Sequence, residues 1–236
     1  MSDHNGSEFK GFKPKLFKFI KDLKANNNRD WFTENKPRYQ SDVVEPVLQF
    51  MDALKPKLHK ISPHILVKAK AHNGSMFRIY RDTRFSKNKD PYKEHVGCQF
   101  RHELGRDAHA PGFYFHLEPG NVFFGGGVWM ADSDSLHKIR QYIVDNPRAW
   151  SNVKKNAKIK KYFPEGIAGD GLTRPPRGFD KEHQHIEDLK RKSFYLMRSV
   201  PMKTAKSPDI VTEVSETYKA AMPLMRFLGK ALEVKI

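Results

Sequence analysis

Residues 113–124 read FYFHLEPGNVFF and predict two antiparallel strands joined by a tight turn. Apolar and polar side chains alternate on both sides of Pro119 and Gly120, and a Pro-Gly pair is typical of the two central residues of a type II turn. With a two-residue loop, Phe115 lies opposite Phe124 in the neighbouring strand. Type II is not the preferred turn of a two-residue hairpin, so a slightly longer loop, which shifts the register by one residue, is the alternative.

The alternation gives this hairpin one apolar face and one mixed face. We expect five side chains to be buried on the apolar face: Phe113, Phe115, Leu117, Val122 and Phe124. On the mixed face, His116 and Glu118 point the same way, which makes them candidate catalytic residues for general acid–base chemistry, or metal ligands. The glycines Gly125 and Gly127 on this face allow close approach of a ligand or of another backbone. The structural alternative is a hydrogen-bonded histidine beneath a covering helix that these glycines admit.

The rest of the chain predicts an α+β fold with a mainly antiparallel sheet, a meander, packed against helices from the N- and C-terminal parts. Residues 14–61 have helical periodicity, residues 76–128 have strand periodicity, and residues 133–236 are mixed helical with one strand. The predicted strands are Met76–Tyr80, Val96–Arg101, Phe113–Glu118, Val122–Gly125 and Phe194–Val200. No repeat or linker marks a boundary, so we expect a single domain over residues 1–236.

Composition indicates a folded protein that attracts anions. The chain has 236 residues, 38% of them hydrophobic, and 43 Lys and Arg against 27 Asp and Glu give a formal net charge of +16. Such charge favours anionic partners. A single Cys98 fits a reducing compartment. The polar residues 1–8 have no signal-peptide core and no apolar run is long enough to span a membrane, so we expect a cytoplasmic protein without a membrane partner. Neither a cofactor nor an oligomeric state is specified.

Residues 78–95, RIYRDTRFSKNKDPYKEH, carry the most concentrated charge. Guanidinium groups match the oxygens of carboxylates and phosphates. Strand alternation puts Arg78 on the face of Tyr80 and Arg81 on the other. We therefore expect Arg81 to form a structural ion pair, and the nearest acids along the chain are Asp82, Asp90 and Glu94. The candidate ligand-binding residues are Arg78, Tyr80, His95, Arg101 and Tyr114. The alternative is an ion-pair network that only holds the loop in place.

Several segments together resemble the uncharacterised bacterial and fungal family known as domain of unknown function 2461. They are Phe12, the Asn26–Phe32 run with Asn27, Arg29 and Trp31, the Phe77–Lys93 run, the Leu117–Trp129 run and Gly178–Lys192. The most specific are Phe77–Phe85 followed by Pro91, Tyr92 and Lys93, and the three glycines 125–127 before Trp129. The resemblance covers nearly the whole chain. It implies a shared fold, but no activity, substrate, cofactor or functional residue.

Three other features have functional and structural interpretations. His183, His185 and Glu187 form a second cluster, and only the tertiary structure decides whether they join His116 and Glu118 as metal ligands. Glycines 125–127 lack the Lys and Ser or Thr of a phosphate-binding loop. The segment 138–161 has eight cations against one Asp, which suits a nucleic-acid backbone or a solvated helix face.

These observations favour a soluble domain whose polar pocket binds a small anionic, phosphate- or carboxylate-bearing ligand, with enzymatic activity left open. The alternatives are a basic nucleic-acid-binding accessory protein and a structural or interaction protein. Arginines without acidic partners near one pocket would favour the first function, a continuous positive stripe with exposed aromatic residues the second, and a sealed, mutually paired cluster the third.

Overall fold

Five strands form one antiparallel sheet in the order β1-β2-β3-β4-β5 in the computed structural model, which describes residues 9–105 and 110–236. The strands are β1 (Ile65–Leu66), β2 (Val96–His102), β3 (Gly112–Glu118), β4 (Asn121–Val128) and β5 (Phe194–Val200). Strand order in the sheet equals order along the chain, so the sheet is a meander and the predicted α+β class is confirmed. The polar segment 1–8 lies outside the described residues.

Helices precede and follow the central strands. The N-terminal helices are α1 (Pro14–Ala25), α2 (Arg29–Glu34), α3 (Lys36–Tyr39), a π-helical turn (Gln40–Val44) and α4 (Glu45–Ile61). Those after β4 are α5 (Ser133–Asp145), α6 (Pro147–Lys155), α7 (Ala157–Tyr162), α8 (Ile186–Leu189), α9 (Met202–Lys206) and α10 (Ile210–Ala231). The π-helical turn ends at Val44, and α4 begins at Glu45 with Pro46 in its first turn, whereas Pro56 is accommodated inside that helix. No described helix combines the length and apolarity needed to cross a membrane.

The predicted hairpin register is confirmed. Phe115 pairs with Phe124, Leu117 with Val122 and Glu118 with Asn121, so the loop between β3 and β4 has two residues. Gly120 has φ of +84°, which a glycine adopts without steric cost. The alternative register, shifted by one residue, is therefore wrong.

One predicted strand differs from the structure, and one observed strand was not predicted. Residues 76–80 form only two isolated bridges, Met76 with Cys98 and Tyr80 with Tyr92, because this segment leaves the edge of β2 after one pair. The short strand β1 was not predicted, since two residues carry no period. Residues 181–191 contain the short helix α8, and the preceding loop forms isolated bridges through Ala168, to Tyr195 of β5, and through Gly171, to Arg191.

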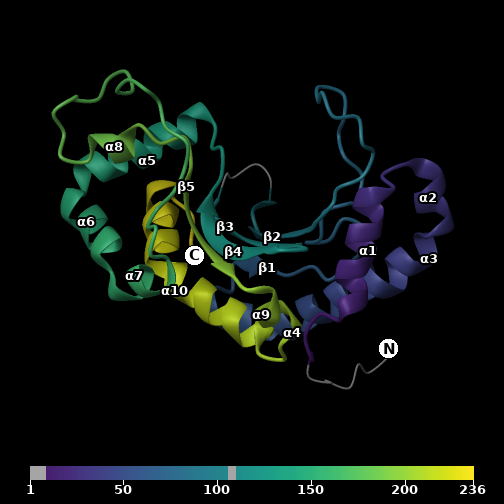
Figure 1. Cartoon of the computed structure of the whole chain (residues 1–236). Helices are drawn as coiled ribbons and strands as arrows, with labels where there is room; N and C mark the ends of the chain where they lie inside the picture. The colour runs from purple at the N-terminus through teal and green to yellow at the C-terminus, as the bar shows by residue number, and fades with distance from the viewer. Residues whose placement is uncertain (1–8, 106–109) are drawn as a thin grey trace.

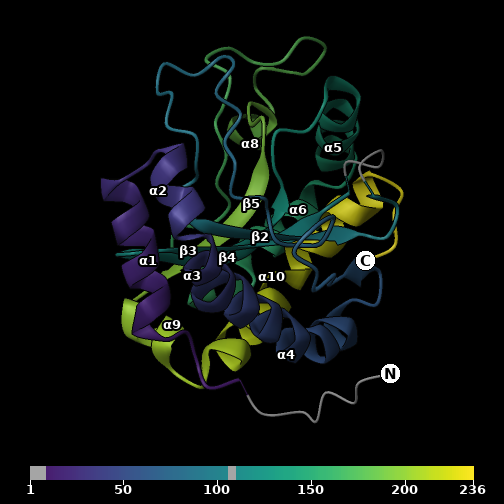
Figure 2. The same cartoon turned by 90° about the vertical axis from the view of Figure 1, so that its right-hand side faces the viewer.

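Helices α4 and α10 cover one face of the sheet (Figures 1 and 2), and the hydrophobic core lies between them and the strands. All five side chains predicted for the apolar face of the hairpin are buried. The Phe115 ring stacks on Phe50 of α4 at 4.6 Å between centroids, and Phe113 stacks on Tyr218 of α10 at 4.3 Å. The aromatic residues that make this sheet thus also attach its two covering helices.

Two loop segments flank the opposite face of the sheet, here called the open face. Among the described residues, no helix lies over this face (Figures 1 and 2). Residues 80–91 and residues 164–185 both rise on the side of the sheet away from α4 and α10 in the two views (Figures 1 and 2). Side chains on the open face come from alternate positions: Gln99, Arg101, Tyr114, His116, Glu118, Phe123, Tyr195 and Met197. Most of them are partly exposed, so this face has accessible side chains on an ordered sheet.

Candidate functional site

His116 of β3 is the centre of an aromatic stack on the open face. Its ring lies 4.3 Å from that of Phe123 on β4, with 10° between the planes, and 4.6 Å from that of His95, which precedes β2. The stack crosses the sheet because these residues occupy the same face of neighbouring chain segments. Only 9% of the His116 side chain is exposed, so its neighbours fix the ring.

A line of hydrogen bonds runs along β3 through the same histidine. The Tyr114 hydroxyl lies 3.1 Å from His116 Nδ1, and His116 Nε2 lies 3.4 Å from a carboxylate oxygen of Glu118. Because a carboxylate only accepts, Nε2–H donates to Glu118, and Nδ1 of the neutral ring accepts the Tyr114 proton. The two predicted catalytic residues therefore contact each other, with Tyr114 as the third member of the line.

Burial shifts the protonation of this group towards its neutral forms. It lowers the pKa of His116 despite the Glu118 carboxylate, and burial together with the nearby His116 lowers the pKa of His95 to about 4. Burial raises the pKa of Tyr114 to about 12. At neutral pH the line thus consists of a phenol, a neutral imidazole and a carboxylate, which suits hydrogen bonding to a ligand better than attack by a phenolate.

The sequence left open whether Gly125 and Gly127 admit a ligand, another backbone or a covering helix. In the structure they admit the backbone of β5. A Cβ at Gly125 would overlap the carbonyl oxygen of Leu196, and one at Gly127 would overlap that of Phe194, so the backbone of β5 approaches both closely. Gly127 also has φ of +150°. No helix needs them, because α10 packs on the other face. As a consequence, two positions beside Tyr114 and Tyr195 carry no side chain on the open face.

Residues 77–95, here called the basic arm, flank the His95 end of this face. Lys93 Nζ donates to the carbonyl oxygens of Arg78 and Tyr80, at 2.6 and 2.7 Å, and so ties the two sides of the arm together. Burial, and then the guanidinium groups of Arg78 and Arg81, lower the pKa of Lys93. The positive charges of Lys93, Arg78 and Arg81 therefore lie close together on the basic arm.

Of the three acids nearest to Arg81 along the chain, Asp90 and not Asp82 lies beside it. Arg81 lies 3.9 Å from Asp90 across the arm, while Asp82 is 2.7 Å from Arg84, whose side chain lowers the pKa of Asp82 to about 2. Successive residues on an extended arm point in opposite directions, which keeps Arg81 and Asp82 apart. Arg81 and Asp82 thus belong to two separate ion pairs.

The remaining predicted ligand-binding residues lie at different places. Tyr80 packs against Phe32 and Tyr92, with ring centroids 6.3 and 5.5 Å away, so it faces α2 rather than the aromatic stack. Arg101 lies on the open face towards the end of β2, where its Nε donates to Gln99 at 3.1 Å. In the described part of the chain, neither Arg78 nor Arg101 has a carboxylate partner.

The second predicted cluster is structural and does not join His116. His185 lies against Ser151 and the carbonyl of Pro147, and Glu187 pairs with Lys190. The sequence reasoning missed its most connected member, Asp188, which accepts hydrogen bonds from Trp150, Lys154 and Arg191. Burial opposes ionisation of this carboxyl, but the bonds from Lys154 and Trp150 outweigh it and lower the pKa of Asp188. These contacts hold α8 against α6.

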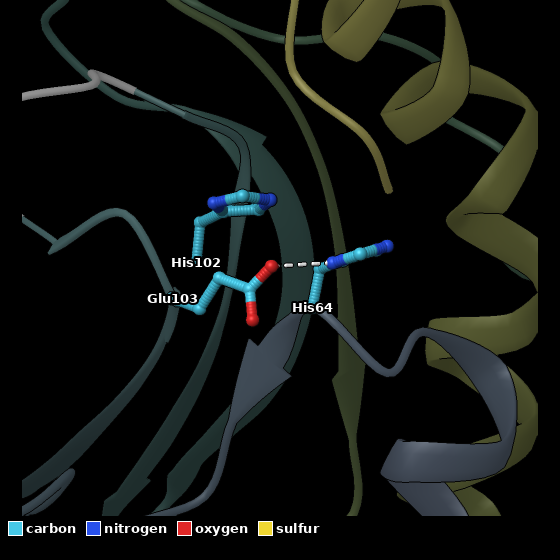
Figure 3. Close-up of side chains that lie close together, drawn as sticks. All are labelled: His64, His102 and Glu103. Atoms are coloured by element: carbon cyan, nitrogen blue, oxygen red, sulfur yellow. Dashed lines mark hydrogen bonds and ion pairs between the residues drawn. The ribbon is translucent and has the colours of Figure 1, made fainter.

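A third cluster, which the sequence reasoning also missed, has the composition of a metal site. His64, His102 and Glu103 come together where β1 meets β2, with possible ligand atoms within 4.8 Å of one another (Figure 3). Both ring nitrogens of His102 and one of His64 are already engaged, however: His64 Nδ1 is 2.6 Å from Glu103, and His102 Nε2 donates to the carbonyl of Lys235 at 2.7 Å. His102 Nδ1 accepts from Leu104 N–H. A metal would have to displace one of these, so the residues fit a C-terminal anchor better than a metal centre.

Two aromatic residues at the far end of the open face also escaped prediction. Trp129, 63% exposed, lies 5.1 Å from the ring of Tyr195, where the chain leaves β4 and returns to β5. The backbone N–H of Met130 donates to Ser193 Oγ at the same place. The signal in the sequence is an aromatic residue two positions after the last glycine of the run 125–127.

Residues 15–227 match the model of a family described as "Conserved hypothetical protein (DUF2461)". No curated protein matches the chain.

Proposed function

Because the chain belongs to the DUF2461 family, whose description names no activity, we propose a function from the site itself: binding of a small phosphate- or carboxylate-bearing ligand on the open face, beside the basic arm. The observation that carries this proposal is that Arg78 and Arg101 have no carboxylate partner in the described part of the chain. A guanidinium fork is suited to bind two oxygens of one anion. The proposal includes no reaction.

Charge on the basic arm supports an anionic ligand. The lowered pKa of Lys93 reflects burial and two neighbouring guanidinium groups. The acidic residues of the arm therefore do not neutralise all of its positive charge. A phosphate or carboxylate near Lys93 and Arg78 would relieve this repulsion. It would also raise the pKa of Lys93 towards its usual value.

The aromatic stack and the line of hydrogen bonds support a ligand with more than a charge. Phe123 and Tyr114 are partly exposed, and they present ring surface beside His116, on the sheet face that also carries Arg101. Glu118 can accept a hydrogen bond from a ligand hydroxyl at the other end of the line. A ring-bearing acid therefore matches the open face better than a bare inorganic ion does.

Thermal melts test the proposal with a small panel: inorganic phosphate, succinate, benzoate and phenyl phosphate. A ligand at about 100 times its Kd stabilises by about 2.7 kcal/mol, which raises the Tm of a chain of this size by roughly 5 to 10 °C. We expect phenyl phosphate or benzoate to give the larger shifts. If no member of the panel raises the Tm of the parent protein, the proposal fails.

Matched arginine variants locate the effect. Arg78→Ala and Arg101→Ala should each retain the parent Tm within about 2 °C and reduce the ligand-induced shift, because neither side chain has an ion-pair partner to lose. Arg84→Ala serves as the control, since it removes an equal charge from an exposed Asp82 pair. Arg81→Ala should lower the Tm itself, as it leaves the half-buried Asp90 contact unmade. Equal loss of the shift in Arg84→Ala would indicate a general charge effect and contradict the site.

One observation favours a second candidate function, binding of single-stranded nucleic acid on the same face. Phe85 at the tip of the basic arm is 94% exposed, and Trp129 at the end of the open face is 63% exposed. Bases stack on such rings and phosphates pair with the surrounding cations. A fluorescence titration with a labelled oligonucleotide would show loss of binding in both Phe85→Ala and Trp129→Ala if this function holds.

A further inference from the structure

A groove of about 740 Å³ lies on the far side of the molecule from the open face, along α10. Its walls come from the C-terminal end of α4 and the first residues of α7, two helices that flank α10 (Figure 1). Because α4 and α10 cover the opposite face of the sheet, this groove shares no lining residue with the site proposed above. None of its lining residues belongs to the His116 line, the His185 cluster or the His64 cluster.

Cations dominate the groove. Lys57 and Lys60 come from α4, Lys158 from α7, and Lys219 and Arg226 from α10, while the single carboxylate is that of Glu216. Glu216 lies 3.8 Å from Lys219. Among the described residues, no hydrogen bond or ion pair engages the side chains of the other four cations. Positive charge from three separate helices therefore meets in one place without neutralisation.

The spacing on α10 shows how the groove is built. Residues 215, 219, 222 and 226 recur every three or four positions, so they form one face of this helix. Ser215 and Met222 are buried and make the floor, whereas Lys219 and Arg226 are exposed at the sides. The floor is fixed by the packed core of α10, and only the ends of the cationic side chains need to move to meet a ligand.

We propose that this groove, here called the basic groove, binds a compact polyphosphate, a small ligand that carries several linked phosphates. Cations on three sides suit several anionic groups at once, whereas a single phosphate would leave most of them unpaired. None of the residues that line the basic groove in the described part of the chain is aromatic. Recognition of nucleobases in single strands depends on such rings, so the phosphates carry the interaction.

Size and charge agree with this class of ligand. The volume lies within the roughly 300–1,000 Å³ of small-molecule sites. Charge-assisted contacts at the exposed cations would be screened by salt, so affinity should fall steeply as ionic strength rises. Linear polyphosphate and the triphosphate group of a nucleotide share this chemistry, and the experiment separates them.

Isothermal titration calorimetry of the full chain tests the proposal, with sodium tripolyphosphate as the free polyphosphate and ATP as the nucleotide. We expect tripolyphosphate to bind more tightly than orthophosphate, with an affinity that falls as salt is raised. In the variant Lys60→Gln/Arg226→Gln, the affinity for tripolyphosphate should fall about tenfold or more, since two charged contacts are lost. An ATP affinity equal to or above that of tripolyphosphate identifies the nucleotide as the source of the phosphates.

The control is Lys21→Gln/Lys36→Gln, which removes the same charge from exposed positions on α1 and α3 and should bind like the parent protein. Arg78→Gln should also bind tripolyphosphate like the parent, which separates this inference from the function proposed above. If the first variant does not fold by circular dichroism, Lys57→Gln/Lys158→Gln replaces it. Absence of binding, equal binding of orthophosphate, an equal loss in the control, or tighter binding of a single-stranded oligonucleotide of equal charge would each overturn the proposal.

Discussion

His95 and His116 lie in contact on the open face, and both are neutral at neutral pH because burial lowers the pKa of each. A protonated ring at either position would add a charge beside the other ring, in a place that offers it little water. The stack is therefore a feature of the neutral rings. Its stability depends on pH through the difference between the folded and the unfolded chain.

We expect acid to destabilise the protein in the range from pH 6.5 down to pH 4. An unfolded histidine binds a proton near pH 6.5, whereas His95 in the folded chain does so only near pH 4, so the unfolded state gains protons first. The stability is complete above about pH 6.5 and falls as the pH approaches 4. Urea melts at pH 7.5 and pH 5 measure the loss.

The variant His95→Gln provides the comparison for this pH effect. Glutamine does not titrate, so the difference between the two melts should become smaller in the variant. His59→Gln, which removes an exposed histidine on α4, should behave like the parent. An unchanged pH dependence in His95→Gln would contradict the assignment.

Phe115 is the residue on which the core depends most directly. Its side chain is fully buried and its ring lies near those of Phe12, Phe50 and Phe124. We expect Phe115→Ala to lower the free energy of unfolding by about 3 to 5 kcal/mol, the cost of a large cavity in a packed core. A urea melt measures this cost, and Phe85→Ala, at a 94% exposed position, should change it by less than about 0.5 kcal/mol. A loss below about 1 kcal/mol for Phe115→Ala would contradict the packing described.

At the scale of elements, the pairing of β4 with β5 depends on the absence of side chains. Gly125 pairs with Met197 and Gly127 with Tyr195, and the carbonyl groups of β5 fill the space where a Cβ would lie. This close approach brings Tyr195 and Met197 onto the open face next to Tyr114. The same glycines thus allow β4 to pair with β5 and leave space on the open face at the proposed site.

Gly125→Ala should therefore separate β4 from β5. We expect a loss of more than about 3 kcal/mol, or failure to fold, because the added methyl group overlaps backbone rather than a movable side chain. Gly171→Ala is the matched control: its Cβ would lie 3.7 Å from the nearest atom, which is ordinary contact. Thermal melts of the two variants compare them directly, and similar Tm values would show that β4 and β5 can move apart without cost.

At the scale of the whole molecule, the sequence predicted what depends on neighbours along the chain. Alternation over residues 113–124 and the Pro-Gly turn determine the hairpin register, because both signals act within a few residues. Arg101, Tyr114, His116 and Glu118 were placed on one face for the same reason. Alternation gave the wrong position for Tyr80. The segment around it forms an isolated bridge and not a strand, and the Tyr80 ring packs against Phe32 of α2.

Features that depend on distant segments could not be predicted. Glu103 meets His64 only because β1 pairs with β2, and His102 also requires the carbonyl of Lys235. The basic groove needs three helices that are separated by about 60 to 100 residues, so no local pattern indicates it. Such sites become visible only when the meander and its covering helices are in place.

Because α10 follows the strands in the sequence, the ribosome synthesises the sheet before the helix that covers its apolar face. Strands β2 to β5 are complete by residue 200, but the helix that covers their apolar face begins at Ile210. Domains fold from the N-terminal end during synthesis, at about 5 to 20 residues per second. Until Tyr218 and the rest of α10 leave the exit tunnel, Phe113 and its neighbours have no cover on that side. The packing around Phe113 is therefore completed only after α10 has been synthesised.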